Sequence, residues 1–239
     1  MTQYKKNGKI LGVVGGLGPA ASAEFLRQLA KRCPATCDQD HPVVYMLADC
    51  DIPDRGTAIL GKGPSPLPKL KEDIQKLVDM GADVIAVPCN TAHYFINEFV
   101  DEIPVQFLHI VEETVKRAQK RSPEGAWMLS TKGTRACGLY QKVAEKYNYK
   151  LYIPSESQSD RAQQVIDHVK AGKIFEAGCI MNDLVEELWT EHDILIMTAC
   201  TELPLGYDAS GLPQERNVSS INALVAACVE ALDEPMQNS

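Results

Sequence analysis

The chain has 239 residues, of which 45% are hydrophobic, so it can bury one large core or two of ordinary size. Its 24 Lys and Arg against 32 Asp and Glu give a net charge of −8, which disfavours non-specific binding to nucleic acid or to an anionic membrane. No apolar run approaches the roughly 20 residues of a spanning helix, and no signal-peptide core follows Met1. We therefore expect a cytoplasmic protein whose eight cysteines are mostly free thiols.

In the first half of the chain, apolar runs alternate with helical patterns. Short apolar runs bounded by turn residues predict strands, and apolar residues at helical spacing predict helices. The expected strands are 9–14, 42–48, 84–88 and 105–108, and the expected helices are 19–31, 67–79, 92–100 and 111–120. The stretch 49–68 has four prolines and three glycines, so we expect it to be mostly irregular, and a loop of this length is usually functional or mobile.

The second half of the chain restarts the pattern. The expected strands are 126–130, 150–153 and 194–199, and the expected helices are 135–146, 160–170, 174–190 and 219–232. A glycine turn is expected at 131–134 and a loop rich in glycine and proline at 206–213. Strands that alternate with helices indicate parallel sheets and the α/β class.

The two halves resemble each other in order and spacing. Val14 precedes Ser130 by 116 residues at the glycine turns, and Cys89 precedes Cys200 by 111 residues at two further strands. We therefore expect two pseudo-symmetric lobes, each a parallel sheet flanked by helices, with the active site in the cleft between them. The first lobe would comprise residues 1–113 and 220–239, and the second would comprise residues 114–219.

Two cysteines occupy corresponding positions in these lobes. Cys89 and Cys200 each follow an apolar run that begins after an aspartate, and small polar residues follow each of them. The carboxyl ends of parallel strands are where α/β proteins bind ligands, and a thiolate is favoured near the N–H groups of a helix N-terminus. The pattern predicts an active site with a pair of thiols.

Six motifs in order carry a resemblance to a known family. The chain resembles the aspartate/glutamate racemase superfamily over about residues 9–225, most closely its aspartate racemase branch, and the motifs are residues 15–19, 51–55, 88–93, 130–134, 169–173 and 200–202. Glycine commonly precedes the second cysteine in this family, and Ala199 stands there instead. The added methyl group would narrow the site, and we expect it to affect the catalytic rate or the range of substrates.

The resemblance implies a racemase that interconverts L- and D-aspartate without pyridoxal phosphate, another cofactor or a metal, and that assembles as a homodimer. Inversion of an α-carbon needs a base on one face of the substrate and an acid on the other. Cys89 and Cys200 would divide this work, one as thiolate and one as thiol, and would exchange roles with the direction of reaction. A thiol with a pKa of about 8.5 needs only modest lowering to act as a base near neutrality.

Hydrogen-bond donors are needed because an amino-acid α-proton is only weakly acidic. Without a pyridoxal ring, the developing negative charge has to be stabilised by hydrogen bonds to the carboxylate and by desolvation. Asn90, Thr91 and Thr201 stand where helices are expected to begin and are candidates for this role. The resemblance adds Thr131 and Thr134 on the second glycine turn.

Two cations are expected to bind the distal carboxylate of a dicarboxylic amino acid. The family pattern assigns this role to Arg55 and Lys170. Arg55 would bind the carboxylate bidentately, and Lys170 would supply a point charge. Either cation could instead be a solvated surface charge, and Lys170 near a helix C-terminus is favoured there in any case.

Several residues keep two interpretations. His93 lies four residues after Cys89 and could tune its thiol or be a satisfied, partly buried histidine. Glu202 is counted with the substrate-binding residues because it could polarise the second cysteine, although it could merely cap its helix. Cys33, Cys37 and His41 only loosely match a zinc pattern because a fourth ligand is missing.

Other functions fit the sequence less well than racemisation does. Gly16-x-Gly18-x-x-Ala21 after a strand resembles a loose dinucleotide fingerprint and would suggest an NAD-dependent oxidoreductase, but Asp49 lies 31 residues after Gly18 instead of about 20. A binding protein that keeps the cleft would not need both cysteines. A glutamate racemase, or a dicarboxylate isomerase or lyase of the same superfamily, is the nearest enzymatic alternative.

Overall fold

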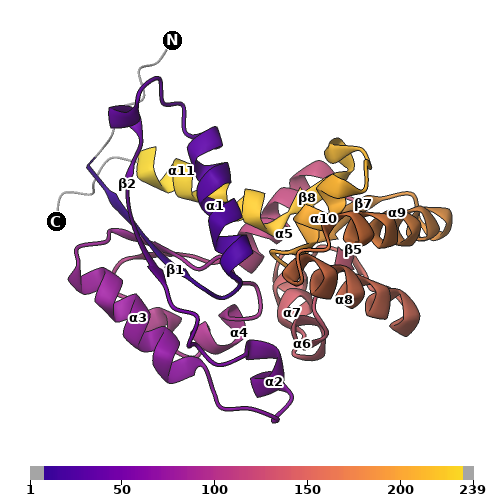
Figure 1. Ribbon diagram of the computed structural model, residues 1–239, viewed down its shortest axis with the longest axis horizontal. Coiled ribbons are helices and arrows are strands. Elements are labelled where there is room, and N and C mark those ends of the chain that lie inside the picture. The colour runs from indigo at the N-terminus through magenta and orange to yellow at the C-terminus, as the bar shows by residue number, and fades with distance from the viewer. Residues whose placement is uncertain (1–7, 234–239) are drawn as a thin grey trace.

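The computed structural model describes residues 8–233, which form two parallel four-stranded sheets flanked by helices (Figure 1). The first sheet has the order β2-β1-β3-β4, and the second has the order β6-β5-β7-β8. Because the second order repeats the first with each number raised by four, the expected α/β fold with two similar halves is confirmed. The strands are β1 (Ile10–Gly15), β2 (Val43–Ala48), β3 (Val84–Ala86), β4 (Gln106–Leu108), β5 (Ala126–Leu129), β6 (Leu151–Tyr152), β7 (Leu195–Thr198) and β8 (Asn217–Ser219).

Helices cover both sheets and connect their strands. Those associated with the first sheet are α1 (Pro19–Arg32), α2 (Arg55–Ile59), α3 (Leu67–Asp79) and α4 (His93–Ile96). The others are α5 (Ile110–Arg121), α6 (Lys132–Ala136), α7 (Leu139–Lys146), α8 (Glu156–Lys170), α9 (Ile174–Glu191), α10 (Leu203–Ala209) and α11 (Ser220–Asp233). None of the helices between residues 8 and 233 is long and apolar enough to cross a membrane.

Local sequence explains where the best-predicted helices begin and end. α3 has a proline in its first turn, where a missing N–H costs no helical hydrogen bond. Leu70, Ile74 and Leu77 form the buried face of this helix. Gly81 follows its last turn with φ of 92°, a conformation that favours glycine. At the start of α8, Ser155 and Gln158 form a reciprocal capping box.

The structure adds detail to one predicted segment of the first half and corrects another. Residues 49–68 are mostly irregular, as expected, but they also contain the short helix α2, which the Asp54 side chain caps by accepting the Thr57 N–H at 2.7 Å. The expected helix at 92–100 is shorter, since α4 ends at Ile96 and a separate short 3-10 turn occupies Val100–Glu102.

The second half needs two further corrections. The expected helix at 135–146 is divided into α6 and α7 at Gly138, whose φ is 65°. The expected loop at 206–213 is helical as far as Ala209, because α10 begins at Leu203. The sequence interpretation also missed β8, a strand of three residues.

One hydrophobic cluster joins the two halves. It contains Leu11 and Phe25 from the first half, Met128 and Met197 from the second, and the buried face of α11. α11 follows β8 of the second sheet and packs against α1 and α5, and Figure 1 shows it running back toward α1. The shared core fixes the halves to each other where α5 and α11 connect them. The lobe boundaries at 113/114 and 219/220 stay a prediction.

Candidate active site

A cavity of about 220 Å³ is lined by residues from both halves of the chain. Cys89 reaches it from the segment after β3, and Cys200 reaches it from the segment after β7, the corresponding strand of the second sheet. Both cysteines are buried, with exposures of 7% and 5%. The cavity therefore lies at the carboxyl ends of equivalent parallel strands, where open α/β sheets place their ligands.

Glu202 interacts directly with the second cysteine. The thiol of Cys200 donates a hydrogen bond to Glu202 Oε2 at 3.1 Å, and the Thr201 hydroxyl donates to the same oxygen at 3.2 Å. Glu202 lies at the start of α10, yet its side chain makes no capping bond to that helix. Burial, together with the negative charge of Glu202, raises the pKa of Cys200 well above its ordinary value. The Cys200 thiol is therefore stabilised in its protonated form.

The segment that carries Glu202 is packed tightly against the first glycine turn. A methyl group at Gly18 would come within 2.6 Å of Glu202 Oε1, and Gly18 has φ of 125°. Only glycine fits both this close approach and this backbone conformation. The glycine turn after β1 thus supports the carboxylate partner of Cys200 across the two halves of the chain.

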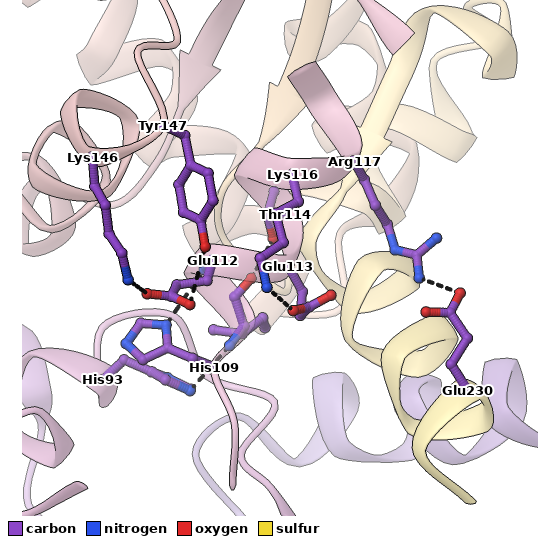
Figure 2. Close-up of polar contacts among 11 residues, drawn as sticks. His93, His109, Glu112, Glu113, Thr114, Lys116, Arg117, Lys146, Tyr147 and Glu230 are labelled. Carbon is purple, nitrogen blue, oxygen red and sulfur yellow. Dashed lines mark hydrogen bonds and ion pairs between the residues drawn. The ribbon is translucent and has the colours of Figure 1, made fainter. Parts of the chain in front are cut away.

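His93 contacts the main chain of Cys89 and not its thiol. Its Nδ1 lies 2.9 Å from the Cys89 carbonyl oxygen, and its Nε2 accepts the Ile110 N–H at 3.3 Å. A carbonyl can only accept and an N–H can only donate, so Nδ1 carries the proton and Nε2 does not. Complete burial and the adjacent His109, shown in Figure 2, hold the pKa of His93 well below its ordinary value. His93 is thus a neutral tether between the Cys89 segment and α5.

The side chain of Asn90 is held by two buried hydroxyl groups. Its Nδ2 donates to Ser220 Oγ at 2.9 Å, and its Oδ1 accepts from the Tyr140 hydroxyl at 2.6 Å. Tyr140 and Ser220 have no exposed surface, and Asn90 is 3% exposed. The amide that follows Cys89 is therefore fixed by residues of the second half and of α11.

Three threonine hydroxyls connect the two halves beside the cavity. Thr91 Oγ1 lies 2.9 Å from Thr134 Oγ1 and 3.3 Å from Thr131 Oγ1, and Thr131 donates to Thr134 at 3.0 Å. Thr131 also caps α6 by accepting the Thr134 N–H. Thr91 and Thr131 line the cavity, whereas Thr134 is fully buried behind them.

Main-chain N–H groups beside both cysteines are free to bind a ligand. Within residues 8–233, the N–H groups of Asn90, Thr91 and Thr201 have no hydrogen-bond acceptor. All three residues line the cavity and are buried. Buried N–H groups are nearly always paired, so unpaired donors on both sides of one cavity indicate a place for an anionic or carbonyl oxygen.

Arg55 is fixed at the edge of the cavity by carbonyl groups. Its guanidinium donates to the carbonyls of Ile52, Pro53 and Leu17, each at 3.2 Å. Its Nε is buried and has no acceptor among the described residues. Because carbonyls carry no net charge, the guanidinium keeps its positive charge and one unpaired donor for a ligand.

Lys170 lies at the end of α8 and lines the same cavity. It is exposed, and it forms no ion pair with any described carboxylate. Asp54 also lines the cavity, and its interaction with the Thr57 N–H, with contributions from the charges of Arg55 and Lys170, outweighs burial and lowers its pKa. Two cations and one carboxylate therefore meet at this end of the cavity.

Most predicted site residues lie together, and several neighbours were missed. Nine of the ten line the cavity, and Thr134 supports it from behind. Gln163 was missed although it stands seven residues before Lys170, a spacing that places both on one face of α8. Tyr140 and Ser220 gave no comparable signal because their role depends on contacts across the fold. A further cavity of about 620 Å³ adjoins the site and shares Asp54, Arg55, Lys170 and Glu202 with it.

The metal and dinucleotide alternatives find no support in the described geometry. No group of three or more His, Cys, Asp or Glu side chains within residues 8–233 is placed to hold a metal ion, and Cys33, Cys37 and His41 form no such group. At the glycine turn, a methyl on Gly16 would meet the Asp49 main chain at 2.5 Å, so this turn is filled by protein on that side.

Comparison with known proteins agrees with the motifs. The chain is 30% identical over 203 residues to the broad specificity amino-acid racemase RacX of Bacillus subtilis, covering 81% of this chain and 86% of that protein. The aspartate racemase of Picrophilus torridus matches with a TM-score of 0.81 and 30% identity over 94% of each chain. The glutamate racemase of Francisella tularensis in complex with D-glutamate has the same fold, with a TM-score of 0.68 and 16% identity over 95% of this chain and 81% of that one.

The family model described as Asp/Glu/Hydantoin racemase matches residues 14–231, which includes every residue of the cavity. The chain therefore belongs to the Asp/Glu/hydantoin racemase family of isomerases.

Proposed function

We propose that this protein interconverts L- and D-aspartate without a cofactor, by a two-base mechanism in which Cys89 and Cys200 exchange protons with the α-carbon. The observation that supports it best is a single small cavity lined by both thiols and by two cations without carboxylate ion pairs, Arg55 and Lys170. A dicarboxylic amino acid has an α-carbon for the thiols and a second carboxylate for the cations. Homodimeric assembly and a cytoplasmic location stay predictions from the sequence.

The resting protonation states follow from the contacts of the second cysteine. Cys200 rests as a thiol because burial and Glu202 disfavour its thiolate. For one enantiomer, the Cys89 thiolate removes the α-proton, and the Cys200 thiol gives its proton to the opposite face. The reverse reaction starts from the Cys200 thiolate, and Glu202 Oε2 can receive the Cys200 proton across the existing hydrogen bond.

Fixed donors stabilise the negative charge that develops after proton removal. The unpaired N–H groups of Asn90, Thr91 and Thr201, with the hydroxyls of Thr91 and Thr131, would bind the α-carboxylate as it takes up charge. Donors held in place before the reaction do not have to reorganise during it, and a single such donor is typically worth about 10²–10³ in rate.

The distal carboxylate would be bound by the two cations. Arg55 has an unpaired Nε and is oriented by three carbonyls, and Lys170 brings a second positive charge. Asp54 at the same end of the cavity would repel a carboxylate that is not held by them. We expect Arg55→Ala and Lys170→Ala to weaken dicarboxylate binding. An unchanged KM and kcat in either variant would show that the replaced residue does not bind the distal carboxylate.

The experiment that tests the function is incubation of either aspartate enantiomer in deuterated water without any cofactor. We expect optical rotation to decay and deuterium to enter the α-carbon. Cys89→Ala and Cys200→Ala should each abolish racemisation, whereas Cys179→Ala, at an exposed cysteine outside the cavity, should leave the rate unchanged. A constant rotation without deuterium uptake by wild-type protein would exclude aspartate racemisation.

A second candidate is racemisation of other amino acids, including glutamate. The adjoining cavity of about 620 Å³ shares the cation end of the site and could receive a longer side chain if Arg55 moved. The relative from Bacillus subtilis is named a broad specificity amino-acid racemase. Glutamate and asparagine assayed beside aspartate would decide, because a kcat/KM for either that equals the aspartate value would favour the wider specificity.

A further inference from the structure

A second cavity, of about 340 Å³, lies where the two halves of the chain are connected. It is lined by the end of α1, the last turns of α5, β8 and the first turn of α11. Four of its lining residues are basic, namely Arg32, Arg117, Lys120 and Arg121, and none of the described residues that line it is acidic. This composition is unusual for a chain with a net charge of −8. It has no lining residue in common with the cavity of the cysteines.

Arg121 is oriented toward this cavity without losing its charge. Its Nη1 donates to the Asn217 carbonyl at 2.7 Å, and its Nη2 donates to the Glu215 carbonyl. Both acceptors belong to the main chain around β8, and a carbonyl oxygen does not neutralise a guanidinium. Arg121 is therefore a fixed positive charge at the cavity wall.

Arg117 is only partly paired. Figure 2 shows it reaching from α5 to Glu230 on α11, and its Nη2 lies 2.8 Å from a carboxylate oxygen of that residue. Glu230 is 65% exposed at its side chain, so water screens this pair. The Nε of Arg117 is buried and has no acceptor among the described residues. One donor of this guanidinium thus remains unsatisfied beside the cavity.

Arg32 and Lys120 complete the basic wall. Both are exposed, and neither forms an ion pair with a carboxylate of the described chain. The first turn of α11 also contributes Asn222 and Ala223 to the lining, so the positive end of a helix of 14 residues faces the same space. Fixed cations, exposed cations and a helix N-terminus converge on one cavity.

We propose that this cavity binds a small polyanion of the diphosphate class. A single carboxylate could pair with only one or two of the four cations, whereas two adjacent phosphate groups offer enough oxygens for all of them. Arginine forks match phosphate oxygens bidentately, and phosphates bind readily at helix N-termini. The cavity can hold a pyrophosphate group with part of whatever it is attached to.

Inorganic pyrophosphate titrated into the full-length protein by isothermal calorimetry, at constant ionic strength, tests the proposal. We expect saturable binding of about one pyrophosphate per chain. Arg32→Ala and Lys120→Ala remove exposed side chains without touching the core, and each should weaken binding by about tenfold, the loss typical of one charge-assisted contact. Arg55→Ala should bind pyrophosphate as wild type does, which separates this site from the cavity of the cysteines.

Lys116→Ala is the matched control because Lys116 lies on the same helix but is paired with Glu113 at 2.8 Å. This variant should bind pyrophosphate with unchanged affinity. The absence of saturable binding, or an equal loss in the Lys116 variant, would overturn the proposal. Citrate that binds as tightly as pyrophosphate would overturn the assignment to phosphates. The calorimetric binding of pyrophosphate and of citrate is independent of racemase activity.

Discussion

Replacing Gly133 by alanine should lower racemase activity while leaving the protein folded. Gly133 of α6 faces Gly56 of α2 across the mouth of the cavity, and an added Cβ would lie 3.1 Å from the Gly56 Cα. Ordinary contacts of this kind begin at 3.4 Å, so α2 has to retreat by at least 0.3 Å, the difference between the two distances. Arg55 is the residue next to Gly56 and would move with it.

The magnitude follows from this displacement. A misplacement of about 1 Å can cost about 10²-fold in rate, so a shift of about 0.3 Å corresponds to a loss of roughly fourfold in kcat/KM, mainly through KM for aspartate. The backbone at Gly133 is helical, where alanine is favoured over glycine by roughly 0.5–1 kcal/mol. This gain offsets the strain of the contact, so the free energy of unfolding should change by less than about 1 kcal/mol.

Gly138→Ala is the matched control for this prediction. Its added methyl group would meet nothing within 4 Å, but its φ of 65° is unfavourable for alanine. Gly138→Ala should therefore lower the free energy of unfolding by about 1–2 kcal/mol and leave kcat/KM unchanged. Initial-rate racemisation assays and urea unfolding measure the two quantities. Full activity in the Gly133 variant would refute the inference that close packing of α2 on α6 positions Arg55.

Three further predictions concern buried polar groups. Glu202→Gln should lower the pKa of Cys200, because the carboxylate charge adds to the effect of burial. Alkylation of that thiol, followed by mass spectrometry, should therefore begin at lower pH than in the wild type. An unchanged pH profile of alkylation would contradict this. His109 has its pKa lowered to about 4 by burial, so the unfolded chain takes up a proton that the folded one does not, and the free energy of unfolding should fall from about pH 6.5 to about pH 4. His109→Gln should reduce the slope of the free energy of unfolding against pH in this range. A slope identical to that of the wild type would contradict the role given to His109. Tyr140→Phe leaves the Asn90 Oδ1 without its donor and should cost about 1–3 kcal/mol in urea unfolding together with a loss of kcat/KM, whereas wild-type stability would show the bond to be dispensable.

Periodicity and short motifs were enough to predict most of the fold. Apolar residues at helical spacing, followed by Gly81, predicted α3 with its observed bounds, and the repeat of Cys89 and Cys200 predicted two similar sheets. Two of the missed elements share a physical cause. α2 and α10 are short helices in segments rich in proline and glycine. The Asp54 cap stabilises α2, and packing on α8 and α9 stabilises α10.

The candidate site was predictable where chemistry is carried by rare residue types. Cysteines at equivalent strand ends and the cations Arg55 and Lys170 could be named from the sequence and the family resemblance, and the structure brings them to one cavity. The support of Asn90 by Tyr140 and Ser220 could not be predicted, because these partners are 50 and 130 residues away and meet only after folding. The role of His93 was left open by its spacing and is decided by its two main-chain partners.

The most direct test of the two-thiol account is the position of deuterium at early times when wild-type protein converts L-aspartate in deuterated water. Two bases on opposite faces should give D-aspartate that carries deuterium at the α-carbon, while the remaining L-aspartate keeps its original proton. Proton magnetic resonance of the separated enantiomers measures both. Product that retains the substrate proton, or deuterium that appears equally in recovered L-aspartate, would contradict the assignment of Cys89 and Cys200 to opposite faces of the substrate.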